Sequence, residues 1–563
     1  MEKDLRNNAA EIQKESDGSN SIGRRSFLKG LAVSAVSVAS IATLNGCSDN
    51  ESQNSISTGD AGSFADSINW DGEYDVVVIG FGAAGASASM TAADEGASVL
   101  LLDKAPEEHV GGNSKLCGQM FVFGNEDVKA TKAYYLAIHG SLPVDEEIVD
   151  VFCENVAFSV DNFANSFGLD KKDFGVCGEG GMAILKSMSP EFPEFPGSDK
   201  ITLNALHDGF SDGYMWQQYR SAVDARSDKI EVWLESPGKS LIQDPQTKAV
   251  IGVEVEKNGA TLMIRAKNGV VLTCGGHENN PEMIRDFLGI QYLSRAGTLY
   301  NTGDGVTMAV AAGADLWHMT SLEGGSGLGG CARFTTDNNI SGMRLIMSSF
   351  GALASMPSSA IMVGAGGTRF MNETEDGRHG KIYKNGEWKT PELPAYTYIV
   401  FDQTDYDFLE SNAPLIDEIK AELITGASVE DLANAIASTI DDPLTAVLRM
   451  PAENLRKTIE SYSEAANSGH DVAFGREENT MRAFDDGPFY AIRVQLLIIN
   501  TQGGARRNAR GEVLDTFGNP IPHLYSAGEF GSMFGNQYQG GGNISECHIF
   551  GQISGRNAAA PKE

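Results

Sequence analysis

Cysteine is scarce in this chain, with seven among 563 residues. No two of them are separated by only two residues, so the sequence lacks the CxxC pairs of zinc ribbons and covalent haem sites, and nothing in it indicates a metal site. Positive charge is also in deficit, because 43 Lys and Arg residues face 76 Asp and Glu residues and leave a net charge of −33. Such an acidic surface repels phosphate backbones, which argues against a nucleic-acid partner.

Long hydrophobic runs are missing, apart from a mild one from Leu31 to Leu44 whose small residues make it a weak membrane span. It lies between a Gly-Arg-Arg-Ser-Phe-Leu-Lys sequence that begins at Gly23, typical of twin-arginine export, and a Leu-Asn-Gly-Cys sequence that ends at Cys47 and resembles a lipoprotein cleavage site. We predict an export signal over residues 1–47 and a flexible tether over 48–70. The protein is then extracytoplasmic and anchored to the membrane only through a lipid on Cys47; a plain signal peptide or an N-terminal anchor is the alternative.

What is present indicates a globular protein, with 41% hydrophobic and 21% charged residues. The run Asp-Val-Val-Val-Ile at 75–79 predicts a strand buried on both faces. A Gly-Phe-Gly-Ala-Ala-Gly turn follows, then a small-residue helix through Glu95 and a second strand over 98–102. We expect helices and loops to predominate from residue 127 to 230.

This strand–turn–helix context makes the glycine turn a strong dinucleotide-binding signal. Gly80 permits the tight turn, Gly82 lets the backbone approach a pyrophosphate, and Gly85 lets the helix pack closely on the strand. The first turn of the helix presents free N–H groups to the phosphates. Asp103 ends the second strand, where a carboxylate can accept ribose hydroxyls.

Four further motifs follow in order: Gly-Gly-Asn-Ser at 111–114, Val-Leu-Thr-Cys-Gly-Gly at 271–276, Asn-Thr-Gly-Asp-Gly at 301–305 and Leu-Tyr-Ser-Ala-Gly-Glu at 524–529. Together with the glycine turn they resemble the FAD-dependent fumarate reductase/3-ketosteroid dehydrogenase superfamily over about residues 74–560. The resemblance implies an α/β fold in which a Rossmann-like FAD-binding domain carries an inserted α+β capping domain. The expected boundaries are 71–317 and 486–563 for the FAD-binding domain and 318–485 for a mobile cap.

The resemblance also implies that FAD is held noncovalently, with the Gly-Gly-Asn-Ser turn beside the isoalloxazine and Glu529 on the ribitol. The residues expected to bind FAD are Gly80, Gly82, Ala84, Gly85, Asp103, Lys104, Gly112, Asn113, Ser114, Gly275, Asp304, Glu529, Asn543 and Ile544. Arg506 and Arg507 follow a Thr-Gln-Gly-Gly turn, where they either contact a phosphate or the cap, or belong to a solvated loop.

The sequence departs from fumarate reductases at the positions that bind the substrate's two carboxylates. In those enzymes a His precedes a Thr-x-Gly-Gly turn and an Arg precedes a Gly-Gly-Asn turn. Here Asn500 precedes the first turn, and the second, within residues 538–543, has no Arg. Because carboxylates buried without cationic partners are strongly destabilised, fumarate itself is a poor substrate for this chain.

Tyr538-x-Gly540-x-Gly542 is instead similar to a segment of 3-ketosteroid dehydrogenases in which a Tyr hydroxyl and a Gly N–H polarise the substrate carbonyl. The similarity predicts Tyr538 and the Gly542 N–H as donors to an oxygen that becomes negatively charged during the reaction. A packing role for Tyr538 is the alternative. The next residues, Ser545 to His548, differ from the steroid enzymes, so the resemblance does not establish a steroid substrate.

In the expected cap, residues 367–373 resemble the superfamily's GxRFxNE segment, and fumarate reductases place a proton-donating Arg shortly after it. Arg378 or His379 is therefore predicted to protonate the α carbon of the substrate. The alternative is that both form a surface ion pair with Glu375 or Asp376. Arg369 and Glu373 are expected to tie the cap together.

We therefore predict an exported FAD-dependent oxidoreductase that transfers a hydride between flavin N5 and the C=C bond of an α,β-unsaturated carbonyl compound. Since the sequence encodes no cytochrome or FMN module, we expect a separate electron-donor protein or carrier, such as a cytochrome, an FMN protein or a quinol-linked donor. Two alternatives stay open: a 3-ketosteroid-type dehydrogenase that runs oxidatively, and a flavin electron-transfer lipoprotein without substrate chemistry.

Overall fold

The fold is taken from a computed structural model of the chain. It describes residues 64–140, 142–176, 189–207, 212–290, 293–325, 350, 353, 356–375, 377–394, 396–413, 416–440 and 449–562. The predicted export signal, the lipidation site and the tether up to residue 63 lie outside these residues. Among the helices of the described residues, none combines the length and the apolar character that crossing a membrane requires.

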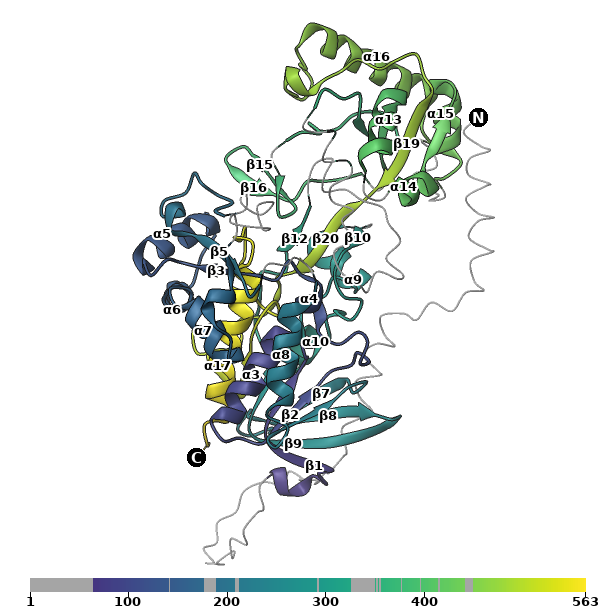
Figure 1. The fold of residues 1–563 in the computed structure, drawn as a ribbon. Coiled ribbons are helices and arrows are strands. Elements are labelled where there is room, and N and C mark those ends of the chain that lie inside the picture. The colour runs from purple at the N-terminus through teal and green to yellow at the C-terminus, as the bar shows by residue number, and fades with distance from the viewer. Residues whose placement is uncertain are drawn as a thin grey trace, which may run out of the picture. The chain divides into compact units, whose positions relative to one another are not determined.

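A mostly parallel sheet organises the cofactor-binding part of the chain (Figure 1). Its strands, in spatial order, are β22 (Glu512–Leu514), β23 (Pro520–Ser526), β9 (Ala260–Leu272), β1 (Gly72–Ile79), β2 (Val99–Leu102) and β6 (Ile230–Trp233). The hairpin β7 (Gly238–Gln243) and β8 (Val250–Lys257) extends from β9. Strands β23, β9, β1, β2 and β6 run parallel to one another, so the C-terminal part of the chain completes the sheet that the N-terminal unit begins.

The predicted strand–helix–strand unit is confirmed. Val76, Val77 and Val78 are fully buried in β1, which pairs with β2 on one side and β9 on the other. Helix α3 (Ala83–Asp94) connects β1 to β2. A run of β-branched residues suits this central strand because both of its faces are covered.

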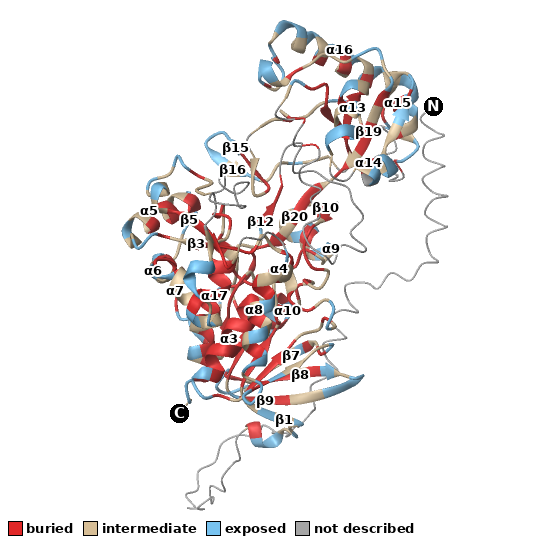
Figure 2. Cartoon of the chain, viewed as in Figure 1, coloured by how far each residue is buried: buried red, intermediate tan, exposed pale blue. Residues whose placement is uncertain are grey.

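Helix α17 (Gly542–Ala559) packs closely against α3, and both are largely buried (Figure 2). A Cβ atom at Gly551 would lie 2.7 Å from the Ala84 carbonyl oxygen, and one at Gly555 would lie 2.2 Å from that of Ala88. Larger side chains would force the helices apart. This contact explains why α3 consists of small residues, and it fixes the start of α17 beside the glycine turn.

The segment 127–230, expected to be mainly helical, also supplies two of the three strands of a small sheet, whose third strand lies just before it. Its helices are α5 (Val128–His139), α6 (Glu146–Val156), α7 (Ser159–Phe167) and α8 (Tyr214–Asp224), and its sheet orders β3 (Met120–Phe123), β5 (Thr202–Ala205) and β4 (Gly175–Val176). These strands have only two to four residues, too few for a period-two pattern to stand out from the sequence.

A second, antiparallel sheet lies in the region predicted to form the cap. It orders β13 (Ile361–Gly364), β17 (Thr397–Asp402), β19 (Phe489–Val494) and β18 (Ile424–Gly426), and the helices of this region are α13 (Gln403–Asn412), α14 (Ile416–Glu422), α15 (Val429–Ala437) and α16 (Ala452–Ser468). Arg369 bonds Glu373 at 2.7 Å and Asp471 at 3.0 Å, so the predicted tie within this region is confirmed. The domain boundaries and the motion of the cap stay predictions.

Short elements between the two sheets position the site. They include α4 (Gly112–Leu116), α9 (Pro281–Met283), α10 (Asp304–Ala311), β10 (Leu293–Arg295), β11 (Leu316–Trp317), β12 (Leu322–Gly324), β14 (Gly377–Arg378), β15 (Lys381–Lys384), β16 (Glu387–Lys389), β20 (Leu496–Thr501) and β21 (Gly504–Ala505). Single turns are η1 (Phe64–Ser67), η2 (Lys171–Asp173), η4 (Ser198–Lys200), η5 (Ile284–Leu288) and η8 (Glu478–Thr480). Strand β20 follows β19 after one residue and pairs with β10 and β12, so a nearly continuous segment joins the two regions.

Candidate functional site

The glycine turn between β1 and α3 has the geometry that its spacing predicts. Gly80 has a φ of 108°, and a Cβ atom there would lie 2.3 Å from the Thr273 carbonyl oxygen. A Cβ atom at Gly85 would lie 1.8 Å from the Gly80 carbonyl oxygen. At Gly82 the nearest atom to such a Cβ is the Ser114 hydroxyl at 3.5 Å, an ordinary contact. Packing therefore requires glycine at Gly80 and Gly85 but not at Gly82, so the glycine there fits a close approach of the pyrophosphate rather than a packing need.

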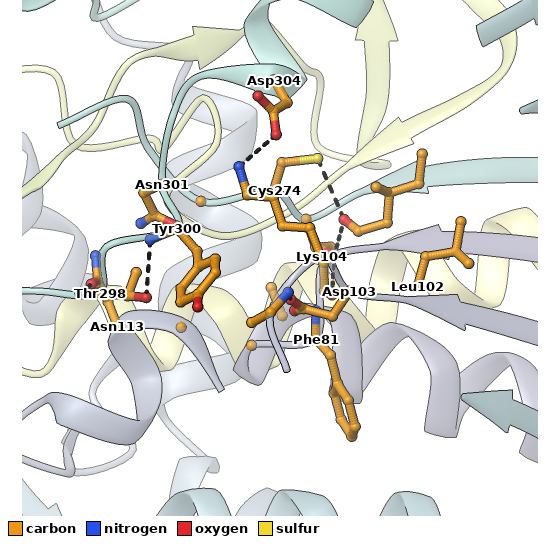
Figure 3. A pocket seen from close by; sticks show the side chains of 18 of the residues that line it. Phe81, Leu102, Asp103, Lys104, Asn113, Cys274, Thr298, Tyr300, Asn301 and Asp304 are labelled. Carbon is orange, nitrogen blue, oxygen red and sulfur yellow. Dashed lines mark hydrogen bonds and ion pairs between the residues drawn. The ribbon is translucent and has the colours of Figure 1, made fainter. Parts of the chain in front are cut away.

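A cavity at this turn contains most of the residues predicted to bind FAD (Figure 3). The predicted residues that line it are Gly80, Gly82, Ala84, Asp103, Lys104, Gly112, Asn113, Ser114, Gly275, Asp304 and Glu529. Gly85 does not line it, which agrees with its packing role. In Figure 3, Lys104 and Asp304 face each other, and their ion pair measures 2.6 Å.

Asp103 shapes the turn from the end of β2. One carboxylate oxygen accepts a hydrogen bond from the Phe81 N–H and the other from the Ala105 N–H, both at 2.7 Å. Burial raises the pKa of Asp103 and outweighs these bonds. The carboxyl group thus lies beside the cavity with lone pairs left for ribose hydroxyls.

Helix α4 brings the Gly-Gly-Asn-Ser turn against α3. The Ser114 hydroxyl accepts a hydrogen bond of 3.0 Å from the Ala83 N–H. The Asn113 amide donates to Glu529 at 3.1 Å and to Glu278 at 3.0 Å. Glu278 has no place in the sequence motifs, so sequence reasoning missed it.

Of the two carboxyl groups that share Asn113, that of Glu278 is fully buried and that of Glu529 belongs to a partly buried residue. Burial, followed by the charge of Glu278, raises the pKa of Glu529 well above its ordinary value, and burial raises the pKa of Glu278. Glu278 also accepts hydrogen bonds from Asn301 at 2.8 Å and from Thr501 at 3.2 Å. A carboxyl group in this setting favours its protonated form and can then donate a hydrogen bond to a cofactor.

A second cavity of about 620 Å³ adjoins the first, because Asn113, Ser114, Glu529 and Cys547 line both. It contains the predicted FAD ligands Asn543 and Ile544 at the start of α17, and three of the four predicted catalytic residues, Tyr538, Arg378 and His379. Ligands in the two cavities would therefore touch at the Asn113–Glu529 contact.

Gly542, the fourth predicted catalytic residue, does not line this cavity. Its N–H donates to the Gln539 carbonyl oxygen at 2.8 Å, so it is not available to a substrate oxygen in this geometry. Gly540 and Gly541 line the cavity in its place. The spacing of the motif locates the turn but cannot tell which of its N–H groups closes the turn and which faces the cavity.

His379 lies between two carboxylates. Its Nε2 is 2.6 Å from a Glu191 oxygen, its Nδ1 is 3.2 Å from a Glu323 oxygen, and its ring packs 4.4 Å from that of Tyr538. Burial lowers the pKa of His379, but the charges and hydrogen bonds of Glu191 and Glu323 outweigh burial and raise it to about 10. His379 is therefore an imidazolium at neutral pH, buried at the cavity wall.

Arg378 lies differently although it is adjacent. Its guanidinium donates to the Glu191 carbonyl oxygen and to a Glu194 carboxylate oxygen, each at 2.8 Å, and it stacks over the rings of Phe192 and Trp388. Neither residue pairs with Glu375 in the structure, and Asp376 lies outside the described residues. The contacts instead join strand β14 to the segment that contains Glu191.

Tyr538 lies in the cavity wall close to Glu323. Burial, followed by the charge of Glu323, raises the pKa of Tyr538 well above its ordinary value, so the phenol stays protonated. Sequence reasoning missed Glu191 and Glu323, because each is an isolated Glu outside any motif. Only their positions in the fold reveal them.

The cavity also has the asparagines noted in the sequence. Asn500, which stands where a His is expected in fumarate reductases, lines it together with Asn543, whose amide donates to Glu323 at 3.3 Å. Among the described residues that line the cavity, the basic side chains Arg378 and His379 are both paired with carboxylates.

Arg507 is not in a solvated loop. Its side chain is fully buried and paired with Glu546, which in turn accepts a 2.8 Å bond from the Met533 N–H. The guanidinium also donates to the Phe530 carbonyl oxygen at 3.1 Å. This ion pair anchors the segment that presents Glu529.

Comparison with known proteins identifies the class of the chain. Residues 75–544 match the family model described as FAD binding domain, and the chain belongs to this family. The chain is 29% identical to digoxin reductase of Eggerthella lenta, over 96% of this chain and 97% of that protein. It is 27% identical to 3-oxosteroid 1-dehydrogenase of Mycolicibacterium smegmatis, over 87% of this chain and 97% of that protein.

Among solved structures, the fold resembles the open conformation of a flavocytochrome c3 fumarate reductase. The TM-score is 0.63 at 25% identity, over 87% of this chain and 79% of that one. The predicted α/β fold, FAD as cofactor and oxidoreductase class are thus confirmed. In the described part of the chain, no cluster of three or more His, Cys, Asp or Glu side chains is arranged to hold a metal ion.

Proposed function

We propose that the protein reduces the C=C bond of an α,β-unsaturated carbonyl compound that is not a dicarboxylate. When bound, FAD supplies the hydride chemistry. The observation that supports the proposal most directly is the continuity of two cavities: the one that fits FAD meets, at Asn113 and Glu529, one whose wall contains a buried imidazolium. A reductase of this kind needs both a flavin and a proton source.

His379 is the better proton donor of the two predicted candidates. Its Nε2 lies beside the Glu191 carboxylate at the cavity wall, and the carboxylates of Glu191 and Glu323 keep the imidazole ring charged at neutral pH. Arg378 stays charged, and its guanidinium is committed to Glu194 and two aromatic rings. We propose that His379 supplies the proton that completes saturation of the C=C bond.

Tyr538 remains the proposed donor to the carbonyl oxygen. Its phenol is protonated and lies in the cavity wall against His379. Such neutral donors stabilise the negative charge that develops on an enolate oxygen as hydride arrives at the β carbon. Gly542 is not part of this proposal, since its N–H is engaged within the turn.

The lining of the cavity favours an uncharged substrate. Glu191, Glu323 and Glu529 contribute acidic groups, and apolar contact comes from Leu116, Met120, Ile499 and Ile544. A dicarboxylate substrate would be placed beside these carboxylates with no unpaired cation in the lining to balance its charge, so its desolvation would be costly.

A 3-ketosteroid-type dehydrogenase that runs oxidatively is the second candidate. It is supported by the Tyr538-x-Gly540-x-Gly542 spacing and by the similarity to a 3-oxosteroid 1-dehydrogenase. The cavity would serve either direction, because the same groups stabilise the same enolate. A flavin electron-transfer lipoprotein without substrate chemistry is the third candidate, and the second cavity counts against it.

The test is anaerobic flavin redox spectroscopy on the FAD-loaded protein, with FAD bound noncovalently. The flavin is reduced with dithionite and then mixed with a panel of enones, with fumarate and with no acceptor. Rapid reoxidation by an enone supports the proposal, and reoxidation that is fastest with fumarate contradicts it. Bleaching of the oxidised flavin by saturated 3-ketosteroids would favour the dehydrogenase.

We also propose that the protein is exported through the twin-arginine route, anchored through lipidated Cys47, and supplied with electrons by a separate protein or carrier. The support is the sequence from Gly23 to Cys47. Replacing both Arg24 and Arg25 with Lys should retain the protein in the cytoplasm, and Cys47→Ala should release it from the membrane fraction. Unchanged fractionation of both variants would contradict the proposal.

A further inference from the structure

Three hydrogen-bond donors converge on a single oxygen of Glu191. The Gly540 N–H donates to Glu191 Oε2 at 2.6 Å, and His379 Nε2 lies 2.6 Å from the same atom. The Gln539 amide reaches it at 3.5 Å. A backbone N–H and a cationic imidazole that meet on one oxygen form the donor arrangement of an oxyanion hole. All three donors are thus occupied by a side chain of the protein itself.

The position of this oxygen makes the arrangement relevant to a ligand. Glu191, Gly540 and His379 all line the 620 Å³ cavity, beside Tyr538. Gly540 belongs to the turn that the sequence indicated for carbonyl recognition, but the N–H predicted for that role, that of Gly542, is closed off. The donor that faces the cavity is two residues earlier, and Glu191 covers it.

We propose that Gly540 and His379 form an oxygen-binding subsite of the substrate cavity, and that Glu191 occupies this subsite until a substrate carbonyl oxygen replaces its carboxylate. Glu191 is then a gate that keeps the subsite filled with a negatively charged oxygen in the absence of substrate. The ligand class is a carbonyl oxygen that gains negative charge during reduction, or a single carboxylate group.

The contacts of Glu191 allow its side chain to move while its main chain stays in place. The Glu191 N–H donates to the Gln539 side-chain oxygen at 3.0 Å, and its carbonyl oxygen accepts from Arg378 at 2.8 Å. The side chain is 11% exposed, so it has a path out of the site. Rotation about the side-chain bonds is sufficient, because these two backbone contacts do not involve the carboxylate.

The charge of the site also permits the exchange. When Glu191 leaves, Glu323 still contacts His379 Nδ1 at 3.2 Å, so the imidazolium keeps one carboxylate partner. Its Nε2–H is then directed at the incoming oxygen. Once hydride transfer has made that oxygen an enolate, the same proton can pass to it and give an enol, which tautomerises to the saturated carbonyl compound. The same exchange explains how a carbonyl is selected: the incoming group must accept bonds from both donors, which an alkyl group cannot do.

This inference rests on the proposed function for the identity of the substrate, but the subsite can be tested without turnover. The experiment titrates FAD-loaded protein with sodium acetate at pH 7 in a calorimeter. Acetate has the same carboxylate group as the Glu191 side chain. We expect Glu191→Ala to bind acetate at least tenfold more tightly than the wild type, whose subsite is filled. Glu194→Ala, a nearby acidic residue that pairs with Arg378, is the matched control and should bind like the wild type.

Equal acetate affinity in Glu191→Ala and the wild type would overturn the inference, and so would an equal gain in Glu194→Ala. Glu191→Gln, which keeps the size of the side chain, provides the same comparison if the Ala variant loses FAD; it should bind acetate more tightly than the wild type. If the Glu191 variants bind acetate more tightly while no enone reoxidises their flavin, that result supports the subsite and rejects the proposed function. If enones reoxidise the flavin but the Glu191 variants gain no acetate affinity, the proposed function stands and the subsite is rejected.

Discussion

The side-chain amide of Asn113 donates a hydrogen bond of 3.1 Å to Glu529, a residue 416 positions further along the chain. The same amide group bonds Glu278 at 3.0 Å. One side chain therefore holds both the buried Glu278 and Glu529, and Glu529 lines both cavities where they meet. Whatever binds there depends on the position of Asn113.

The first prediction concerns this contact. Asn113→Ala leaves Glu278 and Glu529 without their shared donor, and an unsatisfied buried acceptor costs about 1–3 kcal/mol. We expect FAD affinity to fall by about 10- to 100-fold. Fluorescence titration of the apoprotein with FAD measures it. Asn155→Ala is the control, because Asn155 bonds a carbonyl of its own helix; a similar loss there would contradict the prediction.

The second prediction concerns the glycine turn. In Gly85→Ala the new Cβ would lie 1.8 Å from the Gly80 carbonyl oxygen, so α3 must move away from β1. We expect overpacking to cost about 3 kcal/mol or more in unfolding free energy and to reduce the FAD content of the purified protein. Gly366→Ala meets nothing within 4 Å and should change stability by less than about 1 kcal/mol. Urea unfolding followed by circular dichroism compares the two; equal stability would contradict the interpretation.

The turn illustrates what the sequence can reveal. The roles of Gly80 and Gly85 follow from spacing, and the structure agrees. Gly85 contacts Gly80 within one strand–turn–helix unit, whereas Gly80 is also confined by the Thr273 carbonyl oxygen from the neighbouring strand's end. The parallel sheet and the grouping of Asn113 with Glu529 also follow, since each belongs to a motif with a fixed place in the fold.

The acidic part of the site could not be predicted in this way. Glu191 and Glu323 lie 188 and 56 positions from His379, in segments without a motif. Isolated glutamates in an acidic chain do not stand out, and only the fold brings these two to one imidazole. The same holds for Gly542, since the turn decides which N–H remains available.

The third prediction is a pH profile. The pKa of His379 is raised from 6.5 to about 10, so its proton is present below about pH 10 and lost above it. Enone-dependent reoxidation of the reduced flavin should therefore decline on the alkaline side near that pH. In a Glu323→Gln variant one of the two stabilising charges is gone, while burial still lowers the pKa, so the decline should begin at lower pH.

Stopped-flow absorbance between pH 6 and 11 gives the two profiles. His379→Asn removes the titrating group, so any decline that persists in this variant arises elsewhere and is subtracted. Superimposed profiles for the wild type and Glu323→Gln would show that His379 is not the titrating proton donor.

The fourth prediction concerns the buried pair of Arg507 and Glu546. The pair holds the segment that follows Glu529. Arg507 donates to the Phe530 carbonyl oxygen at 3.1 Å, and Glu546 accepts from the Met533 N–H at 2.8 Å. Arg507→Met leaves the Glu546 carboxylate buried without its cation, which costs about 3–5 kcal/mol in comparable pairs. We expect a loss of this size in unfolding free energy, accompanied by weaker FAD binding.

A double variant separates the charge from the packing. When Glu546→Gln is added to Arg507→Met, no unpaired charge remains, so most of the lost stability should return. Asp94→Asn, at the exposed ion pair with Arg226, is the control and should change the unfolding free energy by about 0–1 kcal/mol. If FAD affinity recovers together with stability, the pair acts on Glu529 only through the fold. If stability recovers and affinity does not, the guanidinium itself positions the segment that presents Glu529. Chemical unfolding and FAD titration on the same three variants distinguish these outcomes, and a Glu546→Gln addition that restores neither would contradict the assignment of an ion-pair role to Arg507.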